Sequence, residues 1–162
     1  MKNYRYAFTM IELIFVIVVL GILAAIAVPK FAATRTDAQI AKGRSDISSI
    51  RSAIMTERQT RLIKGDSKFI AAGSAAGQLD AGATAVGSGP LFGGVLTYPV
   101  ADSTSDGHWH NLTRPDVNSS TYSFKSGNTS VTFTYTRSNG KFTCSTTTGT
   151  TAQKTLCKNL IN

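Results

Sequence analysis

An unbroken apolar segment near the N-terminus constrains this chain more than any other feature. Residues 8–28, FTMIELIFVIVVLGILAAIAV, contain a single charged side chain, Glu12. At 1.5 Å per residue, a helix of this length reaches about 31 Å, the thickness of the hydrocarbon core of a bilayer. A carboxylate inside such a helix costs about 2.5–3.5 kcal/mol at mid-membrane and less near the boundary. The segment therefore predicts a membrane-spanning helix in which Glu12 needs a specific partner.

Beyond Pro29, the hydrophobic pattern becomes that of an amphipathic helix. Isoleucines recur at helical spacing along one face, and charged residues lie between them. This isoleucine stripe consists of Ile40, Ile47, Ile50 and Ile54, with Leu62 and Ile63 near its end. A proline inside a helix removes one hydrogen bond and usually kinks the rod. We therefore expect one long helix over residues 8–64, kinked at Pro29 and ended by Gly65-Asp66.

The net charge of +8 is concentrated in the second part of this helix. The stem, residues 30–65, contains eight Lys or Arg and only three Asp or Glu. A basic face can bind nucleic acid or anionic lipid, although it is more often an ordinary solvated face. The charge thus leaves weak DNA binding by the stem as a hypothesis.

The remainder of the chain divides into a loop-rich region and a β-rich region. Residues 66–118 are rich in Gly, Ala and Ser, which predicts loops with a short helix around residues 70–76. Residues 120–145 alternate apolar and polar side chains and are interrupted at 126–128 and 138–140 by Gly/Asn turns, a pattern that predicts a three-stranded antiparallel meander. Its apolar face consists of Tyr122, Phe124, Val131, Phe133, Tyr135, Phe142 and Cys144. Because this face needs a partner, we expect it to cover the isoleucine stripe.

Two cysteines, Cys144 and Cys157, flank a Thr-rich segment near the C-terminus. In a membrane-anchored domain that faces an oxidising compartment, such a pair forms a disulfide; two unrelated thiols are the alternative. Closing a loop of about 14 residues would stabilise the fold by roughly 3 kcal/mol in the chain-entropy model.

Two histidines, His108 and His110, flank Trp109, and two aspartates lie just upstream at Asp102 and Asp106. Histidines on either side of one residue rarely point at one ion without a rigid frame. We therefore interpret the segment as a turn with one buried aromatic, with a metal site as the alternative. We also find no nucleophile triad or phosphate-binding loop, so the sequence predicts no catalytic site, no metal and no cofactor.

The N-terminal segment resembles a known family. Ala7 followed by FTMIELIFVIVVLGILAAIAVP is similar to the N-terminus of type IV pilins and of the pseudopilins of type II secretion. The similarity consists of a short basic leader, a small residue before Phe8, Glu12 at the fifth place of the cut chain, Gly21, and Pro29 at the family's usual place. The family usually has Gly before the cut, where this chain has Ala7.

The resemblance implies a division of the chain. Residues 1–7 are a leader, which a prepilin peptidase removes between Ala7 and Phe8 before Phe8 is N-methylated. Residues 8–29 form the transmembrane and assembly helix, followed by the stem, by a variable loop region at 66–118, and by an antiparallel sheet with a C-terminal disulfide loop at 119–162. The expected fold is α+β and pilin-like, with the long N-terminal helix packed against a three- to four-stranded antiparallel sheet.

The resemblance also assigns roles within the apolar helix. Glu12 pairs with the Phe8 amine of a neighbouring subunit in a filament, where lateral packing excludes water; a pair within one chain is the alternative. Gly21 and Pro29 are weak points, because they cost about 1 and 3 kcal/mol against Ala in a helix interior. Family members often extend there, and a simple kink at Pro29 is the alternative.

These features predict a structural subunit of a type IV pilus filament, used in adhesion, motility or DNA uptake, and not an enzyme. Its partners are copies of itself or other pilins, an inner-membrane assembly platform, and membrane lipid before assembly. The precursor spans the inner membrane once, and the filament is extracellular or periplasmic. The major pseudopilins usually carry a calcium loop near the C-terminus, whereas residues 144–157 contain no acid, which favours the pilus.

Several alternatives remain open. The chain is also compatible with a type II secretion pseudopilin or with a lone membrane-tethered adhesin or sensor. Ala25-Ile26-Ala27 fits a signal-peptidase site, which would place the mature N-terminus at Val28. Finally, residues 116–120, DVNSS, resemble the acidic extended sequon of bacterial oligosaccharyl transferases, so Asn118 is a candidate glycosylation site, although such triplets are common in Ser/Thr-rich chains.

Overall fold

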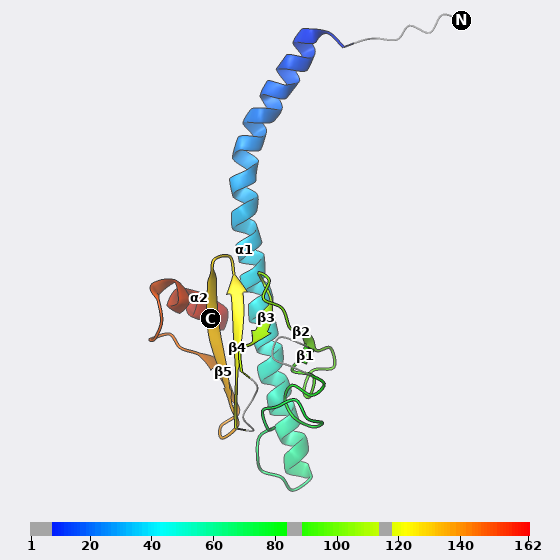
Figure 1. The fold of residues 1–162 in the computed structure, drawn as a ribbon, viewed down its shortest axis with the longest axis vertical. Helices are drawn as coiled ribbons and strands as arrows, with labels where there is room; N and C mark the ends of the chain where they lie inside the picture. Colours follow the sequence, from blue (N-terminus) through cyan, green and yellow to red (C-terminus); the bar gives the residue numbers. More distant parts are fainter. Residues whose placement is uncertain (1–7, 84–88, 114–117) are drawn as a thin grey trace, which may run out of the picture. The chain divides into compact units, whose positions relative to one another are not determined.

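A computed structural model describes residues 8–83, 89–113 and 118–162 (Figure 1). The elements in chain order are α1 (Met10–Ile63), β1 (Pro90–Leu91), β2 (Val100–Ala101), β3 (Trp109–Asn111), β4 (Ser119–Ser126), β5 (Thr129–Thr136), β6 (Lys141–Cys144) and α2 (Thr151–Ile161). The chain divides into two compact units, an N-terminal unit of residues 1–37 and a C-terminal unit of residues 38–162.

The long helix predicted over residues 8–64 is present as α1, and Pro29 lies inside it without ending it. The helix starts two residues later than expected, because Thr9 is its cap rather than its first turn. At the other end, Lys64 and Gly65 close the last turn with hydrogen bonds to Arg61 and Leu62, and Gly65 has a positive φ of 85°. A left-handed Gly is a common way to end a helix.

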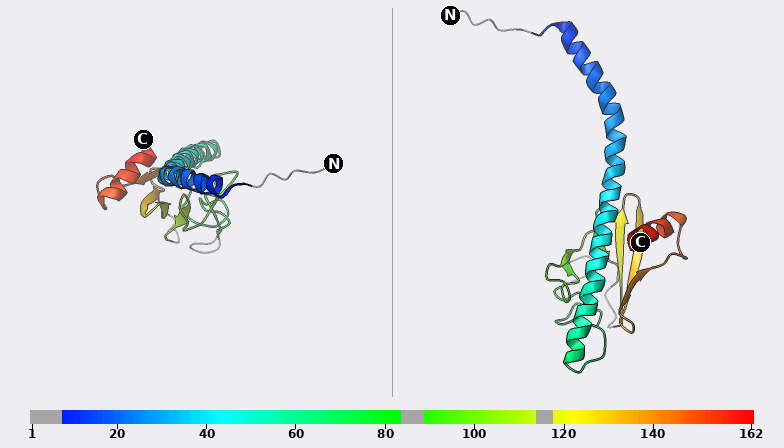
Figure 2. Two further views of the ribbon diagram at one scale, coloured as in Figure 1. Left: turned by 90° about the horizontal axis from the view of Figure 1, so that it is seen from above. Right: turned by 180° about the vertical axis from the view of Figure 1, so that it is seen from behind.

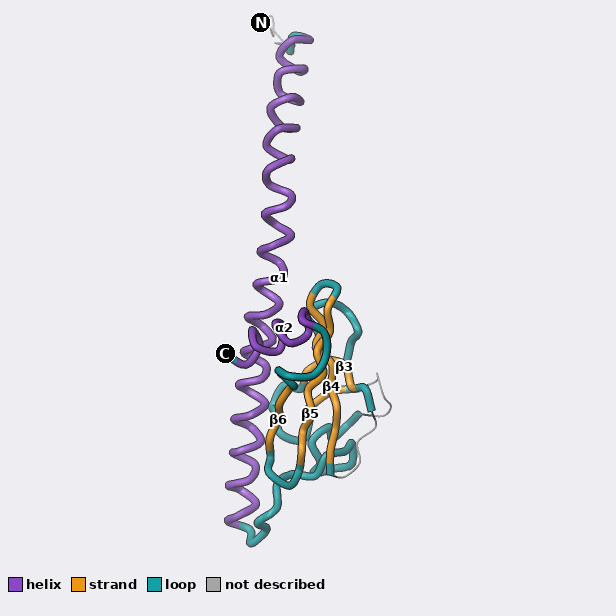
Figure 3. The backbone as a smooth tube through the Cα atoms, turned by 90° about the vertical axis from the view of Figure 1, so that its left-hand side faces the viewer, coloured by secondary structure: helices purple, strands orange, loops and turns teal. Residues whose placement is uncertain are grey.

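The β-rich region forms a four-stranded antiparallel sheet in the order β3-β4-β5-β6 (Figure 3). The three predicted strands of the meander are β4, β5 and β6, and the hairpin between β4 and β5 turns through Gly127-Asn128. Gly127 has φ 58°, the positive value that a type II′ hairpin requires at its first central residue. The edge strand β3 and the two-stranded pair β1-β2 lie in the region that we expected to be loop.

The C-terminal part of α1 lies along one face of the four-stranded sheet, as opposite views show (Figures 1 and 2). Ile47, Ile50 and Ile54 of the isoleucine stripe are fully buried and form one core cluster with the apolar face of the sheet. The buried members contributed by the sheet are Trp109, Tyr122, Phe124, Val131, Phe133, Tyr135 and Phe142. The predicted covering of the stripe is thus confirmed.

The stripe ends earlier than expected, since Leu62 and Ile63 are exposed. The short helix expected around residues 70–76 is wrong, because this segment consists of bends and turns. Gly73 and Gly77 both have positive φ, 129° and 76°, which an α-helix cannot contain.

The C-terminal segment also differs from its expectation as a disulfide loop. Thr150 caps a helix, α2, in a reciprocal capping box with Gln153, and α2 packs beside β5. The helix buries Leu156, Cys157 and Leu160. The predicted disulfide between Cys144 and Cys157 is present, with Cα atoms 6.0 Å apart, so it joins α2 to the end of β6.

Candidate functional site

The N-terminal unit presents an apolar helix with nothing packed on it among the described residues. All large apolar side chains from Phe8 to Phe31 are exposed. The best 18-residue window of α1 has a mean hydropathy of 3.1, so the helix is long and apolar enough to cross a membrane. An apolar surface of this size marks a contact with lipid or with another protein.

Glu12, the only acid in this segment, closes the first turn of α1. The backbone N–H and the hydroxyl of Thr9 both donate to Glu12 Oε2 at 2.8 Å, and the Glu12 N–H donates back to Thr9 Oγ1 at 3.3 Å. This is the Thr-x-x-Glu capping box, which satisfies amide groups that a helix start leaves unpaired. The signal that could have predicted this helix start is the sequence Thr9-Met10-Ile11-Glu12.

The capping box leaves part of the carboxylate available. Both bonds from Thr9 reach Oε2, and none of the hydrogen bonds among the described residues uses Oε1. Phe8 directly precedes the cap and is 86% exposed. Ala7 lies outside the described residues, so the expected cut between Ala7 and Phe8 stays a prediction.

Gly21 has no structural reason within the chain to be a glycine. A Cβ built at Gly21 meets nothing within 4 Å, and the residue lies in regular helix. The lack of a side chain at Gly21 therefore has its effect outside this chain, where another helix approaches, or in a conformation in which the helix extends. Pro29 also lies within regular helix and removes the N–H that would bond the Ala25 carbonyl.

The cations of the stem have a structural task in the C-terminal unit. Five of its eight basic side chains donate to backbone carbonyl oxygens of other segments. The pairs are Lys42 with Gly107, Arg44 with Asn159, Arg51 with Phe142, Arg58 with Ser67 and Arg61 with Gly77. Arg44, Arg51 and Arg58 recur every seven residues, which the sequence could have revealed as a second stripe beside the isoleucines.

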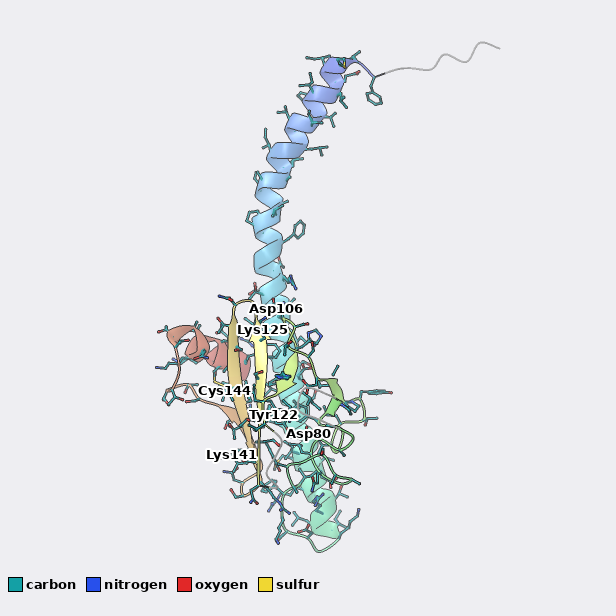
Figure 4. The ribbon with its side chains drawn as sticks, in the orientation of Figure 1. Asp80, Asp106, Tyr122, Lys125, Lys141 and Cys144 are labelled. Carbon is teal, nitrogen blue, oxygen red and sulfur yellow. A yellow bond between two sulfur atoms is a disulfide. The ribbon has the colours of Figure 1, made fainter. Side chains whose placement is uncertain are left out.

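A buried carboxylate holds the loop-rich region to the sheet (Figure 4). Asp80 is 1% exposed, and it accepts from the Phe92 N–H at 2.9 Å, from the Tyr122 hydroxyl at 2.6 Å and from Asn111 Nδ2 at 3.3 Å. Burial raises the pKa of Asp80, although these bonds oppose the shift. The Tyr135 hydroxyl donates to the Ile70 carbonyl, and burial raises its pKa to about 12.

The His108–His110 segment contains the one buried aromatic that we favoured, but Trp109 and His110 lie in strand β3 rather than in a turn. Trp109 is fully buried, and its Nε1 donates to Asp46 Oδ2 at 3.0 Å. Burial raises the pKa of Asp46, and the Trp109 bond partly offsets the rise. His110 Nδ1 lies 2.7 Å from Asp102 Oδ1, and no group of three or more metal-ligating side chains occurs in the described part of the chain.

Asn118, the candidate glycosylation site, lies in an exposed turn before β4. Its carbonyl accepts from the Arg137 N–H at 2.9 Å. The preceding residues of the extended sequon, 116–117, lie outside the described residues, so glycosylation stays a prediction.

Comparison with known proteins addresses the N-terminal segment. Residues 2–28 match the family model of the prokaryotic N-terminal methylation motif, which includes Thr9, Glu12 and the start of the exposed apolar helix. The match covers the same N-terminal segment on which the resemblance to type IV pilins rested. Two type IV major fimbrial proteins, both FimA of Dichelobacter nodosus, are 39% identical to this chain over 56 residues, 35% of this chain and 36% of theirs. The chain thus matches these relatives over about a third of their length. No solved structure matches it.

Proposed function

We propose that this chain is a structural subunit of a type IV pilus filament. The observation that carries the proposal is the exposed apolar helix whose first turn is closed by Thr9 and Glu12, inside the matched methylation motif. Such a helix needs lipid before assembly and other helices afterwards, because water cannot cover it. The function that this helix supports is therefore assembly.

The proposed assembly sequence begins with a precursor that spans the inner membrane once through α1. A prepilin peptidase removes residues 1–7, and the amine of Phe8 is exposed and methylated. Glu12 Oε1, which the capping box leaves unbonded, then accepts the charged amine of a neighbouring subunit. In a dry helical bundle neither charge can be solvated, so an unpaired Glu12 would be costly and a paired one fixes the register.

Two related hypotheses make different predictions. A type II secretion pseudopilin would give short periplasmic filaments rather than surface filaments, and its major subunits usually carry a calcium loop where this chain has the α2 disulfide and no acid between Cys144 and Cys157. A lone adhesin or sensor would retain its leader and would give no filaments. DNA uptake would rest on the charge of the stem alone, where five of the eight cations also hold backbone carbonyls.

Electron micrographs of sheared cell-surface material, with the subunit identified by mass spectrometry, test the proposal. We expect filaments from the wild-type chain and from Asp37→Asn, which removes an exposed acid from the same helix. We expect few or none from Glu12→Val, with the subunit still present in the membrane fraction. Normal filaments from Glu12→Val would contradict the role of the charge, and filaments confined to the periplasm would favour the pseudopilus.

A further inference from the structure

A hollow of about 510 Å³ in the C-terminal unit is lined by three cations. It lies where the loop after α1 meets the start of β4 and the turn between β5 and β6. Its lining consists of Arg58, Ser67, Lys68, Phe69, Asn118, Thr136, Arg137 and Ser138. No acidic side chain occurs among these described residues, so the described lining is basic and otherwise rich in hydroxyl and amide groups.

Two of the cations are held in place by their own contacts. The Arg58 guanidinium lies 3.9 Å from the centre of the Phe69 ring, and its Nη1 donates to the Ser67 carbonyl at 3.0 Å. Arg137 Nε donates to the Phe69 carbonyl at 3.2 Å, a bond that leaves its two terminal nitrogens for other acceptors. A fixed guanidinium loses little side-chain entropy when it binds a ligand.

The three cations form no salt bridge with the described residues. Among the described residues, no carboxylate lies within 4.0 Å of Arg58, Lys68 or Arg137. The neighbouring acid, Asp66, pairs with Arg61 at 3.6 Å and accepts from the Lys68 N–H at 3.0 Å. The pKa of Asp66 is lowered chiefly by that N–H bond and further by the nearby cations. Asp66 opposes part of the charge of Lys68 and Arg137, and the positive charge that remains around the hollow attracts an anion.

The size and the lining narrow the class of anion. A volume of about 510 Å³ falls within the range of about 300–1,000 Å³ that is usual for small-molecule sites, and it exceeds what a bare sulfate or phosphate fills. Hydroxyl and amide side chains can exchange hydrogen bonds with the hydroxyl groups of a sugar. Duplex DNA requires an exposed cationic stripe, whereas these three cations surround one hollow.

We propose that this hollow binds an acidic sugar unit, carboxylated or sulfated, of a glycan outside the cell. The two terminal nitrogens of Arg137 donate to the carboxylate or sulfate oxygens in a bidentate pair, and Lys68 adds a mobile point charge. Thr136 and Asn118 bond the sugar hydroxyls. The hollow lies within the C-terminal unit of one chain, so binding can be measured on the unassembled subunit, while the source of the glycan outside the cell rests on the proposed pilus function.

Calorimetric titration of the full chain in non-ionic detergent micelles tests the proposal. The probes are a sulfated heparin disaccharide, its unsulfated and uncharged analogue, sodium sulfate and a short DNA duplex, all at one low salt concentration. We expect the sulfated disaccharide to bind most tightly. Lys68→Gln and Arg137→Gln should each weaken its binding about tenfold or more, since a hydrogen bond to a charged group contributes about 1.5–3 kcal/mol.

A matched control separates this site from general charge. Lys158→Gln makes the same charge change on an exposed face of α2 and should leave the affinity unchanged within about twofold. Lys68 is exposed and its ammonium bonds nothing among the described residues, so Lys68→Gln should fold normally. Arg137→Lys keeps the charge but removes the forked guanidinium. Its affinity for the sulfated disaccharide should therefore lie between those of the wild type and Arg137→Gln.

Four results would overturn the proposal. Equal binding of the uncharged analogue would exclude an anion site. Sulfate binding as tightly as the disaccharide would exclude a role for the sugar ring. Tighter binding of the duplex, weakened by the same variants, would identify a nucleic-acid site instead. Equal losses in Lys68→Gln and Lys158→Gln would show that only net charge matters.

Discussion

Replacing Asp80 by alanine tests how the loop-rich region is attached to the sheet. The change removes the acceptor of two well-formed bonds, from the Phe92 N–H at 2.9 Å and from the Tyr122 hydroxyl at 2.6 Å. Phe92 and Tyr122 are both 0% exposed, so water cannot replace the lost acceptor. The third bond, from Asn111 at 3.3 Å, is longer and contributes less.

The expected loss is about 3 kcal/mol of unfolding free energy. Each buried donor left without an acceptor costs about 1–3 kcal/mol. Relief of the buried charge offsets part of this sum, because burial raises the pKa of Asp80 and so disfavours its ionised form at neutral pH. Tyr122→Phe removes only one of the donors and should cost about 1 kcal/mol.

The single tryptophan of the chain, Trp109, is buried in the same core and reports unfolding by fluorescence. Urea titrations of the full chain in non-ionic micelles would compare wild type, Asp80→Ala, Tyr122→Phe and the exposed control Asp37→Ala, which should change stability by less than about 0.5 kcal/mol. A loss below about 1 kcal/mol for Asp80→Ala would refute the role of Asp80 as an anchor.

The same residue predicts a pH dependence of known sign. Because the folded pKa of Asp80 is raised above its ordinary value of 3.8, the folded state binds this proton more tightly than the unfolded state. The stability of the wild type relative to Asp80→Asn should therefore fall as the pH rises from below 3.8 through the folded pKa, and be constant above it. A difference that does not change with pH would contradict the raised pKa.

Intact-mass analysis of the chain in surface material should place the mature, methylated N-terminus at Phe8, and a mass that includes the leader would contradict cleavage. Cys144→Ser should destabilise the C-terminal unit by about 2–5 kcal/mol in the same urea assay, whereas alkylation of both native thiols in the wild type would exclude the bridge. In a filament map, the rise per residue should exceed 1.5 Å between Gly21 and Pro29, and Ala at both positions should make filaments less extensible. Unbroken helical hydrogen bonding between Gly21 and Pro29 would contradict the extension and would be compatible only with a kink at Pro29.

The sequence predicted the elements whose pattern is long and regular. The isoleucine stripe has a helical period over more than a dozen residues. In β4 and β5, apolar and polar side chains alternate over eight residues each. Both patterns predict from the sequence which face is buried. Strand β3 has only three residues, and it is a strand because it pairs with β4. A pairing partner 13 residues away along the chain leaves no local signal.

Helix α2 was missed because threonine-rich segments have low helix propensity. Its capping box, Thr150 with Gln153, was the available signal. The helix predicted at residues 70–76 is absent for the opposite reason. The alanines of this segment favour a helix, but Gly73 adopts a positive φ that a helix cannot contain. The basic hollow could not have been predicted, since it joins Arg58, Lys68 and Arg137 from three separate segments.

The bonds between the stem and backbone carbonyls have a consequence for how this surface can change over generations. Every residue carries a carbonyl oxygen, whatever its side chain. Arg58 donates to the Ser67 carbonyl and Arg61 to the Gly77 carbonyl, so neither bond depends on the identity of the side chain at the accepting residue. Loops attached in this way can exchange most of their exposed side chains while their path stays the same, which separates what the molecule displays from what keeps it folded.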